Sequence, residues 1–184
     1  MAVSQPSPRV GLFIDGPNLH TTSKALGFDI DFKRLLSQFE CLGSLWRAFY
    51  YTTLSEDQTQ RSFRPLVDWL DYNGYTVIAK TAKDFIDESG QRRTRGNTNI
   101  ELAVDAMALA GKFDHMVLFS GDGDFRAMVE AVQRRGVRVT VVSTMSIHPP
   151  MLADELRRQA DVFIDLASLR LKLGRNAAAR APQA

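Results

Sequence analysis

Acidic side chains follow two strand-like segments of this chain, in each case just beyond the end of an apolar run. Asp15 closes the run 10–14, and Asp122 follows the run 116–119, with Asp124 two residues later. In an open parallel sheet the ligand crevice lies beyond the carboxyl ends of the strands. We therefore expect these acids to meet at one edge of a parallel sheet, where such folds keep their chemistry.

Another acid lies inside an apolar helix. Asp105 stands in the middle of the segment 100–109, which is apolar nearly all round and which we therefore expect to be largely buried. An ionised carboxylate in such surroundings is costly unless a cation or hydrogen-bond donors meet it. Glu101, one turn earlier, would bring a second carboxylate to the same cavity. An internal salt bridge or a capping bond is the alternative explanation for Asp105.

Each acid taken alone has an ordinary structural explanation. Asp122 and Asp124 precede a helical segment and would serve as its N-cap and first-turn acid. Asp15 and Asn18 flank a Gly-Pro pair, which is typical of a turn. The coincidence of these acids with Asp105 favours a metal site, because carboxylates that share one crevice repel one another unless a divalent cation lies between them.

The other residue types narrow the choice of metal. Carboxylate oxygens with neither a histidine cluster nor a cysteine pair favour a hard ion, Mg²⁺ or Mn²⁺, over zinc. Cys41 is the only cysteine, and His20, His115 and His148 are scattered, so we expect each histidine on the surface or in the core. His20, two residues past Asn18, is the one histidine near the acids in the sequence.

Strand-like and helix-like segments alternate along most of the chain. Apolar periodicity and capping signals predict strands at 10–14, 45–51, 75–79, 116–119, 137–142 and 162–164 and helices at 31–39, 57–72, 100–110, 124–135, 150–160 and 166–173. This alternation predicts an α/β fold with a mainly parallel, doubly wound sheet in a single domain, 10–173. Residues 1–9 are expected to be flexible and residues 174–184 to form a disordered tail.

One polar segment, 80–99, interrupts the alternation. A Ser-Gly turn signal inside it indicates an excursion, such as a hairpin, that leaves the sheet near the crevice. Arg92, Arg93 and Arg95 cluster there, away from any helical face, and we expect them to contact the substrate because clustered arginines attract a phosphate backbone. Other arginine pairs lie on helical faces, where solvation explains them equally well.

Composition sets the class of protein. The chain has 184 residues, 45% of them hydrophobic, and a formal net charge of +2, which suits one domain with one core. A single cysteine excludes an internal disulfide and fits a reducing compartment, so we expect a cytoplasmic protein. The N-terminus lacks the features of a signal peptide, and no apolar run approaches the ~18 residues of a membrane span, so we expect no membrane contact.

In these segments the chain resembles the LabA-like NYN domains, a branch of the PIN-like nucleases. The resemblance covers about residues 10–169 and depends on the order and spacing of four motifs: Phe-Ile-Asp-Gly-Pro-Asn at 13–18, Arg-Gly-Asn-Thr-Asn-Ile-Glu-Leu-Ala-Val-Asp-Ala-Met at 95–107, Ser-Gly-Asp-Gly-Asp-Phe at 120–125 and Ala-Asp-Val-Phe-Ile-Asp-Leu at 160–166. It implies a compact, PIN-like three-layer α/β/α fold, a divalent-metal site and ribonuclease activity.

The resemblance also implies roles for particular residues, position by position. Asp15, Asp105 and Asp122 resemble the metal-binding acids, Asp124 resembles an auxiliary acid, and Asn18 resembles the polar residue that helps to hold a phosphate or a water. All five are therefore expected at the catalytic site.

Two positions depart from the family pattern. Many members have an aspartate where this chain has Asn99 and a lysine where it has Arg95. Arginine keeps the charge and the donors, so Arg95 stays among the expected substrate-binding residues. Asn99 is also placed among the substrate-binding residues. Because an amide supplies only a neutral oxygen, Asn99 is expected to affect the metal affinity and any second metal position.

The leading functional hypothesis is metal-dependent hydrolysis of phosphodiester bonds, with single-stranded RNA as the substrate. The acidic crevice and the arginine-bearing excursion indicate hydrolysis of a polyanion, and the preference for RNA comes from the resemblance. The alternative is an RNA-binding or regulatory module with weakened chemistry, for which Asn99 is the sequence observation. The oligomeric state stays open, with a homodimer among the alternatives.

Two other phosphate-handling classes fit less well. A phosphatase that forms a phosphoaspartate needs a paired acid two residues from its nucleophile, and the neighbours of Asp15 at that spacing are Phe13 and Pro17. A topoisomerase-primase site needs a glutamate after its first strand, where this chain has Asp15.

Overall fold

A seven-stranded sheet forms the centre of the protein. The structure, a computed structural model, describes residues 6–55, 59–86, 92–95 and 97–175, with the backbone alone for Ser55, 59–63, 83–86 and 92–95. The strands are β1 (Arg9–Asp15), β2 (Ser44–Ser55), β3 (Tyr75–Ile86), β4 (Arg92–Arg95), β5 (His115–Phe119), β6 (Arg138–Ser143) and β7 (Val162–Asp165). Their order is β4-β3-β2-β1-β5-β6-β7, and six strands are mutually parallel while β4 runs antiparallel to β3.

The strand order reverses at β1, which lies between β2 and β5. Ligand sites of doubly wound sheets lie at such a reversal, beyond the carboxyl ends of the strands. Asp15 is the last residue of β1, and Asp122 follows β5 by three residues. The topology therefore brings both acids to the position that the sequence predicted.

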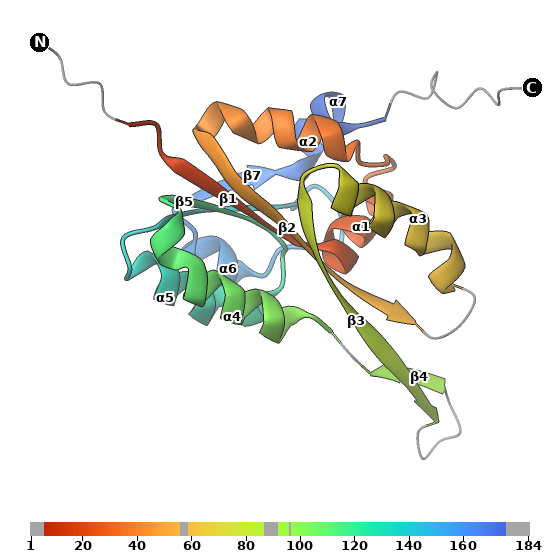
Figure 1. The fold of residues 1–184 in the computed structure, drawn as a ribbon. Coiled ribbons are helices and arrows are strands. Elements are labelled where there is room, and N and C mark those ends of the chain that lie inside the picture. The colour runs from red at the N-terminus through yellow and green to blue at the C-terminus, as the bar shows by residue number, and fades with distance from the viewer. Residues whose placement is uncertain (1–5, 56–58, 87–91, 96, 176–184) are drawn as a thin grey trace, which may run out of the picture.

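Helices cover both faces of the sheet, so the predicted three-layer α/β/α, doubly wound fold is confirmed. The helices are α1 (Gly16–Ala25), α2 (Phe32–Phe39), α3 (Thr59–Tyr72), α4 (Asn99–Leu109), α5 (Arg126–Gln133), α6 (Asp154–Gln159) and α7 (Arg170–Leu173), with 3₁₀ turns at Glu40–Leu42, Ala110–Lys112, Gly123–Phe125 and Leu166–Leu169. In Figure 1, α1, α2, α3 and α7 lie on one side of the sheet and α4, α5 and α6 on the other.

Alternation along each strand divides the apolar side chains between two cores. Ile14 and Tyr50 face the core under α1, α2 and α3, whereas Phe13 and Tyr51 face the core under α4, α5 and α6. The runs β1 and β5 are almost entirely buried because both of their faces are covered. No helix in the described part of the chain is long and apolar enough to cross a membrane.

One helix, α1, was not predicted from the sequence, and another, α6, begins later than predicted. Residues 16–18 form the start of α1 and not an isolated turn, because Asp15 caps the helix and Pro17 lies in its first turn. The helix predicted from Pro150 begins only at Asp154. Before it, the amides of Met151 and Ala153 bond to carbonyls of other segments, which holds this stretch outside a helix.

The prediction that 100–109 would be largely buried is wrong. Ile100, Val104 and Met107 on α4 are 70%, 59% and 37% exposed, while Leu102 and Ala106 are buried. The helix covers the sheet with one face only, and within the described residues the opposite face has no layer over it. A helix that is apolar nearly all round is therefore not necessarily buried on every side.

The polar excursion is a hairpin, as the sequence indicated. β3 pairs with β2 as far as Ala82 and then continues beyond the parallel sheet, where Lys83–Ile86 pairs antiparallel with β4. The residues that join the two strands, 87–91, lie outside the described residues, as does residue 96. Figure 1 shows this arm projecting from the sheet past the ends of the other strands.

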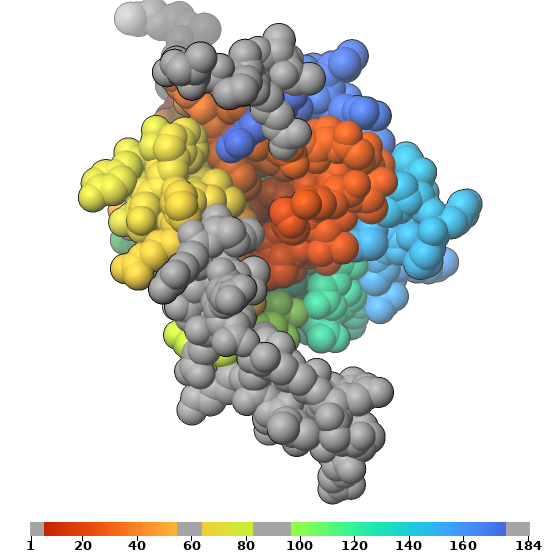
Figure 2. All heavy atoms as spheres, turned by 90° about the vertical axis from the view of Figure 1, so that its right-hand side faces the viewer, coloured from red at the N-terminus to blue at the C-terminus, as the bar shows by residue number. Residues whose placement is uncertain are grey.

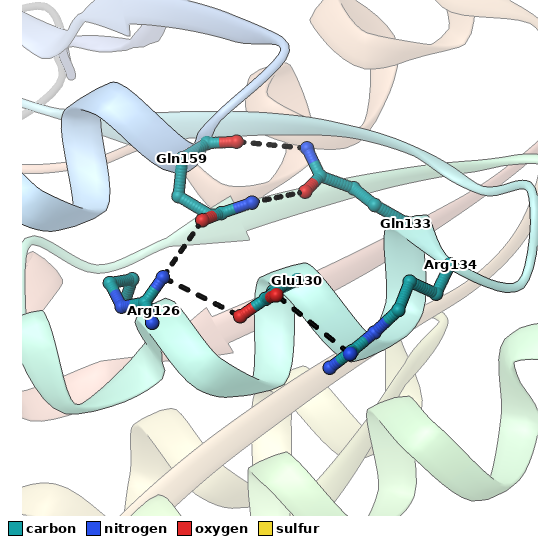
Figure 3. Close-up of polar contacts among 5 residues, drawn as sticks. All are labelled: Arg126, Glu130, Gln133, Arg134 and Gln159. Carbon is teal, nitrogen blue, oxygen red and sulfur yellow. Dashed lines mark hydrogen bonds and ion pairs between the residues drawn. The ribbon is translucent and has the colours of Figure 1, made fainter.

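A network of polar side chains holds α6 against α5 (Figure 3). Gln133 and Gln159 exchange two hydrogen bonds, from Gln133 Nε2 to the Gln159 carbonyl at 2.9 Å and from Gln159 Nε2 to Gln133 Oε1 at 2.8 Å. Arg126 donates to Gln159 Oε1 at 3.1 Å and pairs with Glu130, which also pairs with Arg134. The network fixes α6 beside the loop that follows β5.

The ends of the chain are described only in part. Residues 1–5 and 176–184 lie outside the described residues. Of the predicted tail, Gly174 forms a bridge with Ile30, and the Arg175 amide donates to the Asp29 carbonyl at 3.0 Å.

Candidate functional site

Asp15 is the most buried of the predicted site acids, with 7% of its surface exposed. Its Oδ1 caps α1 by accepting the Asn18 amide at 3.2 Å, and its Oδ2 accepts the Ser120 hydroxyl at 2.8 Å. Burial raises the pKa of this carboxyl, the two hydrogen bonds oppose that rise, and the negative charge of Asp122 adds to it. The folded protein thus holds Asp15 where its charge is costly.

Ser120 links the two strand-end acids. Its Oγ donates to Asp15 and accepts the Asp122 amide at 3.2 Å, and the residue is 1% exposed. Asp122 caps the 3₁₀ turn Gly123–Phe125 by accepting the Asp124 amide at 3.0 Å through Oδ1. Sequence reasoning assigned no role to Ser120, although it stands in the Ser-Gly-Asp motif directly beside the acid.

Asn18 ties the same loop to α1. Its Oδ1 accepts the amide of Gly121 at 3.2 Å and the hydroxyl of Thr22 at 3.5 Å. The side chain therefore lies between the ends of β1 and β5, and its oxygen positions the backbone of the acidic loop.

Asn99, the first residue of α4, reaches the site from a third segment. Its Nδ2 donates to Asp122 Oδ2 at 2.9 Å, so both carboxylate oxygens of Asp122 accept a hydrogen bond from this chain. Where a carboxylate would repel Asp122, the amide stabilises it. The sequence placed Asn99 near the acids, and the structure shows that its contact is with Asp122.

Asp105 meets a phenol. Tyr51 Oη donates to Asp105 Oδ2 at 2.9 Å, and Tyr51 is also the register partner of Asp15 on the neighbouring strand. Burial and then the charge of Asp105 raise the pKa of the Tyr51 hydroxyl, which keeps it a donor. Asp105 is therefore met by a hydrogen-bond donor, and the sequence had not pointed to Tyr51 as its partner.

Glu101 does not add a free carboxylate. Its Oε1 forms an ion pair with Lys80 Nζ at 2.6 Å, and the hydrogen bond from Lys80 lowers the pKa of the Glu101 carboxyl. Its Oε2 is buried and has no hydrogen-bond partner among the described side chains. Lys80 is thus a basic residue beside the hairpin that sequence reasoning did not single out.

The described side chains contain no group of three or more His, Cys, Asp or Glu that could hold a metal ion. Asp15 and Asp122 form the acidic pair, Asp105 is held on Tyr51, and Asp124 is exposed. A carboxylate pair still suits Mg²⁺, which keeps several waters and is usually held by one or two carboxylates together with substrate phosphates. The raised pKa of buried Asp15 beside Asp122 is also what a cation would relieve.

The remaining predicted residues are the hairpin arginines and the histidines. Arg92, Arg93 and Arg95 occupy β4, and their side chains lie outside the description. The scattered histidines are as expected: His115 is buried against Thr140 at 2.8 Å, and His20 and His148 are exposed.

Figure 2 looks onto the edge of the sheet where the parallel strands end. The red-orange surface of α1 lies above the green start of α4 and the blue-green residues that follow β5. These are the segments that carry Asn18, Asn99 and Asp122. A further carboxylate, that of Glu155 on α6, lies against Gly123, where an added Cβ would overlap it.

The sequence and the fold of this chain are similar to those of known proteins. Residues 9–168 match the family model described as the NYN domain. The chain is 39% identical over 166 residues to the low amplitude and bright protein LabA of Synechococcus elongatus, covering 88% of this chain and 86% of that protein. Its fold is similar to the crystal structure of VPA0982, a protein of unknown function from Vibrio parahaemolyticus, with a TM-score of 0.68, 25% identity and coverage of 89% of this chain and 96% of that one.

Proposed function

Because the chain belongs to the NYN domain family, which is related to the PIN-like nucleases, we propose that it is a divalent-metal-dependent ribonuclease that hydrolyses phosphodiester bonds in single-stranded RNA. The observation that carries the proposal is the pair Asp15 and Asp122, joined through Ser120 where the strand order reverses.

The proposed cofactor is Mg²⁺ or Mn²⁺. Asp15 and Asp122 would hold it, with Asp105 acting through a water because Tyr51 already occupies one of its oxygens. When bound, such an ion lowers the pKa of a coordinated water and polarises a phosphate oxygen, so that no protein nucleophile is needed.

The chain's own residues would bind and orient the RNA. The hairpin strand with Arg92, Arg93 and Arg95 extends past the carboxyl ends of the parallel strands, and its positive charge would attract the phosphate backbone. Asn18 fixes the loop that carries Asp122, so the acids keep their spacing when the strand enters. Asp124 is exposed. As an auxiliary carboxylate it would accept a proton or a hydrogen bond from a water at the site.

Cleavage of a labelled single-stranded RNA in Mn²⁺ tests this proposal. We expect the wild type to cut the RNA and Asp122→Asn to lose about 100-fold or more in rate, because one charge of the pair is gone. Asp71→Asn is the matched control: Asp71 is exposed near the end of α3, which leads to the opposite edge of the sheet. Equal cleavage by the wild type and Asp122→Asn would refute the assignment.

A second candidate function is RNA binding without efficient cleavage. The observation in its favour is the hydrogen bond from Asn99 to Asp122, which stabilises that carboxylate without any cation. Binding of RNA by the wild type without cleavage, together with cleavage by Asn99→Asp, would favour this module over the active enzyme.

A further inference from the structure

A cavity of about 510 Å³ lies on the face of the sheet opposite α4. α1, the segment that leads into α2, the middle of β2 and one face of α3 surround it. In Figure 2 it corresponds to the hollow between the yellow surface of α3 and the orange surface of α1. Its volume is in the range of pockets that take small organic ligands, about 300–1,000 Å³.

The floor of the cavity is aromatic and rigid. Phe32 meets the ring of Tyr50 edge-on at 5.6 Å and the ring of Tyr75 edge-on at 5.9 Å. Tyr75 Oη donates to the Phe32 carbonyl at 2.7 Å, which fixes the backbone below the ring. A floor that is already held in place does not have to be ordered when a ligand binds.

Trp69 forms one wall and keeps a free surface. It is 39% exposed although it lines the cavity, and Pro65 and Leu66 on the same face of α3 continue the wall. An indole that lines a cavity and is also partly exposed is suited to stack on another flat ring.

The rim is polar but carries charges of both signs. Asp29, Arg175 and His20 line it, and Asp29 and Arg175 are oppositely charged. This balance suits an uncharged ring with hydrogen-bonding edges better than it suits a phosphate.

One wall of the cavity lies close to Asp15. A Cβ added to Gly16 would lie 2.6 Å from Tyr50 Cζ and 2.7 Å from its hydroxyl oxygen, so the phenol lies directly against the residue that follows Asp15. Burial and the charge of Asp15 raise the pKa of that phenol. His20 is five residues beyond Asp15 along α1, about 7–8 Å at the rise of a helix, which is on the scale of one nucleotide of extended strand.

We propose that this cavity binds an unpaired nucleobase of the same RNA strand whose phosphate lies at Asp15 and Asp122, with the base stacked on Trp69 above the floor formed by Phe32 and Tyr50. The inference deepens the proposed function and depends on it for the position of the phosphate. In this arrangement α1 sets the distance between the phosphate and the base.

The test uses the fluorescence of Trp69. The chain has two tryptophans, and Trp46→Phe leaves Trp69 alone; Trp46 packs on Phe49 and Phe113 in the other core. The probes are a short single-stranded RNA and a strand of equal length with abasic sites, both in a chelator so that nothing is cleaved. We expect the RNA to quench Trp69 and the abasic strand to leave it unchanged.

Affinity measured by fluorescence anisotropy completes the test. Trp69→Ala should weaken RNA binding by about 5- to 150-fold, the loss expected for one base stacked on an aromatic ring. Trp69→Phe should restore most of the affinity, and Tyr72→Ala, which removes a 90% exposed aromatic from the same helix, should bind like the wild type.

The outcomes separate this inference from the proposed function. Quenching by RNA without cleavage in Mn²⁺ would keep the base cavity and refute the nuclease. Suppose instead that the wild type cleaves RNA and that Trp69 in the Trp46→Phe variant responds equally to both strands, or to neither. This result would overturn the base cavity and leave the nuclease proposal intact. The quenching comparison needs no Trp69 variant, so it holds even where Trp69→Ala does not fold.

Discussion

Asn99 Nδ2 donates a hydrogen bond to Asp122 Oδ2 at 2.9 Å, across the junction between α4 and the loop after β5. An amide here stabilises a site acid that a carboxylate would repel. The contact stabilises the metal-free fold. Compared with an aspartate at this position, Asn99 leaves one negative charge fewer to attract a cation.

Replacing Asn99 by aspartate should therefore act in opposite directions with and without metal. In a chelator, Asn99→Asp should lower the free energy of unfolding by about 1 kcal/mol, because one hydrogen bond is exchanged for repulsion. In Mn²⁺ it should bind the ion about tenfold more tightly, or about 1.4 kcal/mol. Thermal unfolding in both conditions measures the effect, and a metal-free stability equal to that of the wild type would contradict it.

The ionisation of Asp15 should make the fold less stable as the pH rises. Its folded-state pKa is raised by burial, so the unfolded chain ionises first, and the stability present below about pH 3.9, the ordinary value for aspartate, is lost as the pH rises through the folded pKa. Asp15→Asn removes this loss. In a chelator, its melting temperature relative to the wild type should rise as the pH increases above about 4; a constant difference would show that Asp15 does not titrate abnormally.

Removal of the Tyr51 hydroxyl should destabilise the protein through Asp105. Tyr51→Phe takes away the donor at 2.9 Å and should cost about 1.5 kcal/mol, the low end for a hydrogen bond to a charged group. Denaturant unfolding measures it. Tyr72→Phe, on an exposed side chain, is the control and should change stability by less than about 0.5 kcal/mol; equal effects of the two changes would argue against the Asp105 contact.

Asp165 should be a stabilising residue of the fold and not of the site. Burial opposes its ionisation, but hydrogen bonds from Thr144, Ala167, Ser146 and Met145 together lower its pKa. Asp165→Ala should cost about 2 kcal/mol through the lost cap and the unpaired donors.

The pH dependence of Asp165 has the opposite sign to that of Asp15. Because its folded pKa is lowered, its contribution is present above about pH 3.9 and is lost as the pH falls through the folded value. The gap in melting temperature between the wild type and Asp165→Ala should shrink towards low pH, and a gap that widens there would contradict this assignment.

The sequence was sufficient to predict a mainly parallel, doubly wound sheet and the edge where Asp15 and Asp122 meet, because both acids follow apolar strand-like runs and the carboxyl ends of parallel strands share one edge. It did not show that Tyr51 would meet Asp105, because register between strands distant in sequence is a tertiary property. Nor did the local pattern reveal the open side of α4, since apolar content does not say which face a sheet covers.

The start of α1 and the cavity illustrate the same limit. Asp15 before Gly16 and Pro17 is a recognisable helix start, but a Gly-Pro pair is also a turn, and only the hydrogen bond to the Asn18 amide decides between them. Trp69 has apolar neighbours in the sequence, which do not show how far it is exposed. Its exposure depends on the cavity that α3 lines together with α1 and the start of α2.

The proposed function requires that Asp15 and Asp122 together hold a divalent ion. Calorimetric titration of Mn²⁺ into the wild type, Asp15→Asn, Asp122→Asn and Asp71→Asn tests it without any assumption about the RNA. We expect the wild type and Asp71→Asn to bind alike and each of the other two to lose at least about tenfold in affinity, since even outer contacts of metal sites cost that much. Identical titrations for all four proteins, or no binding by the wild type, would contradict the account.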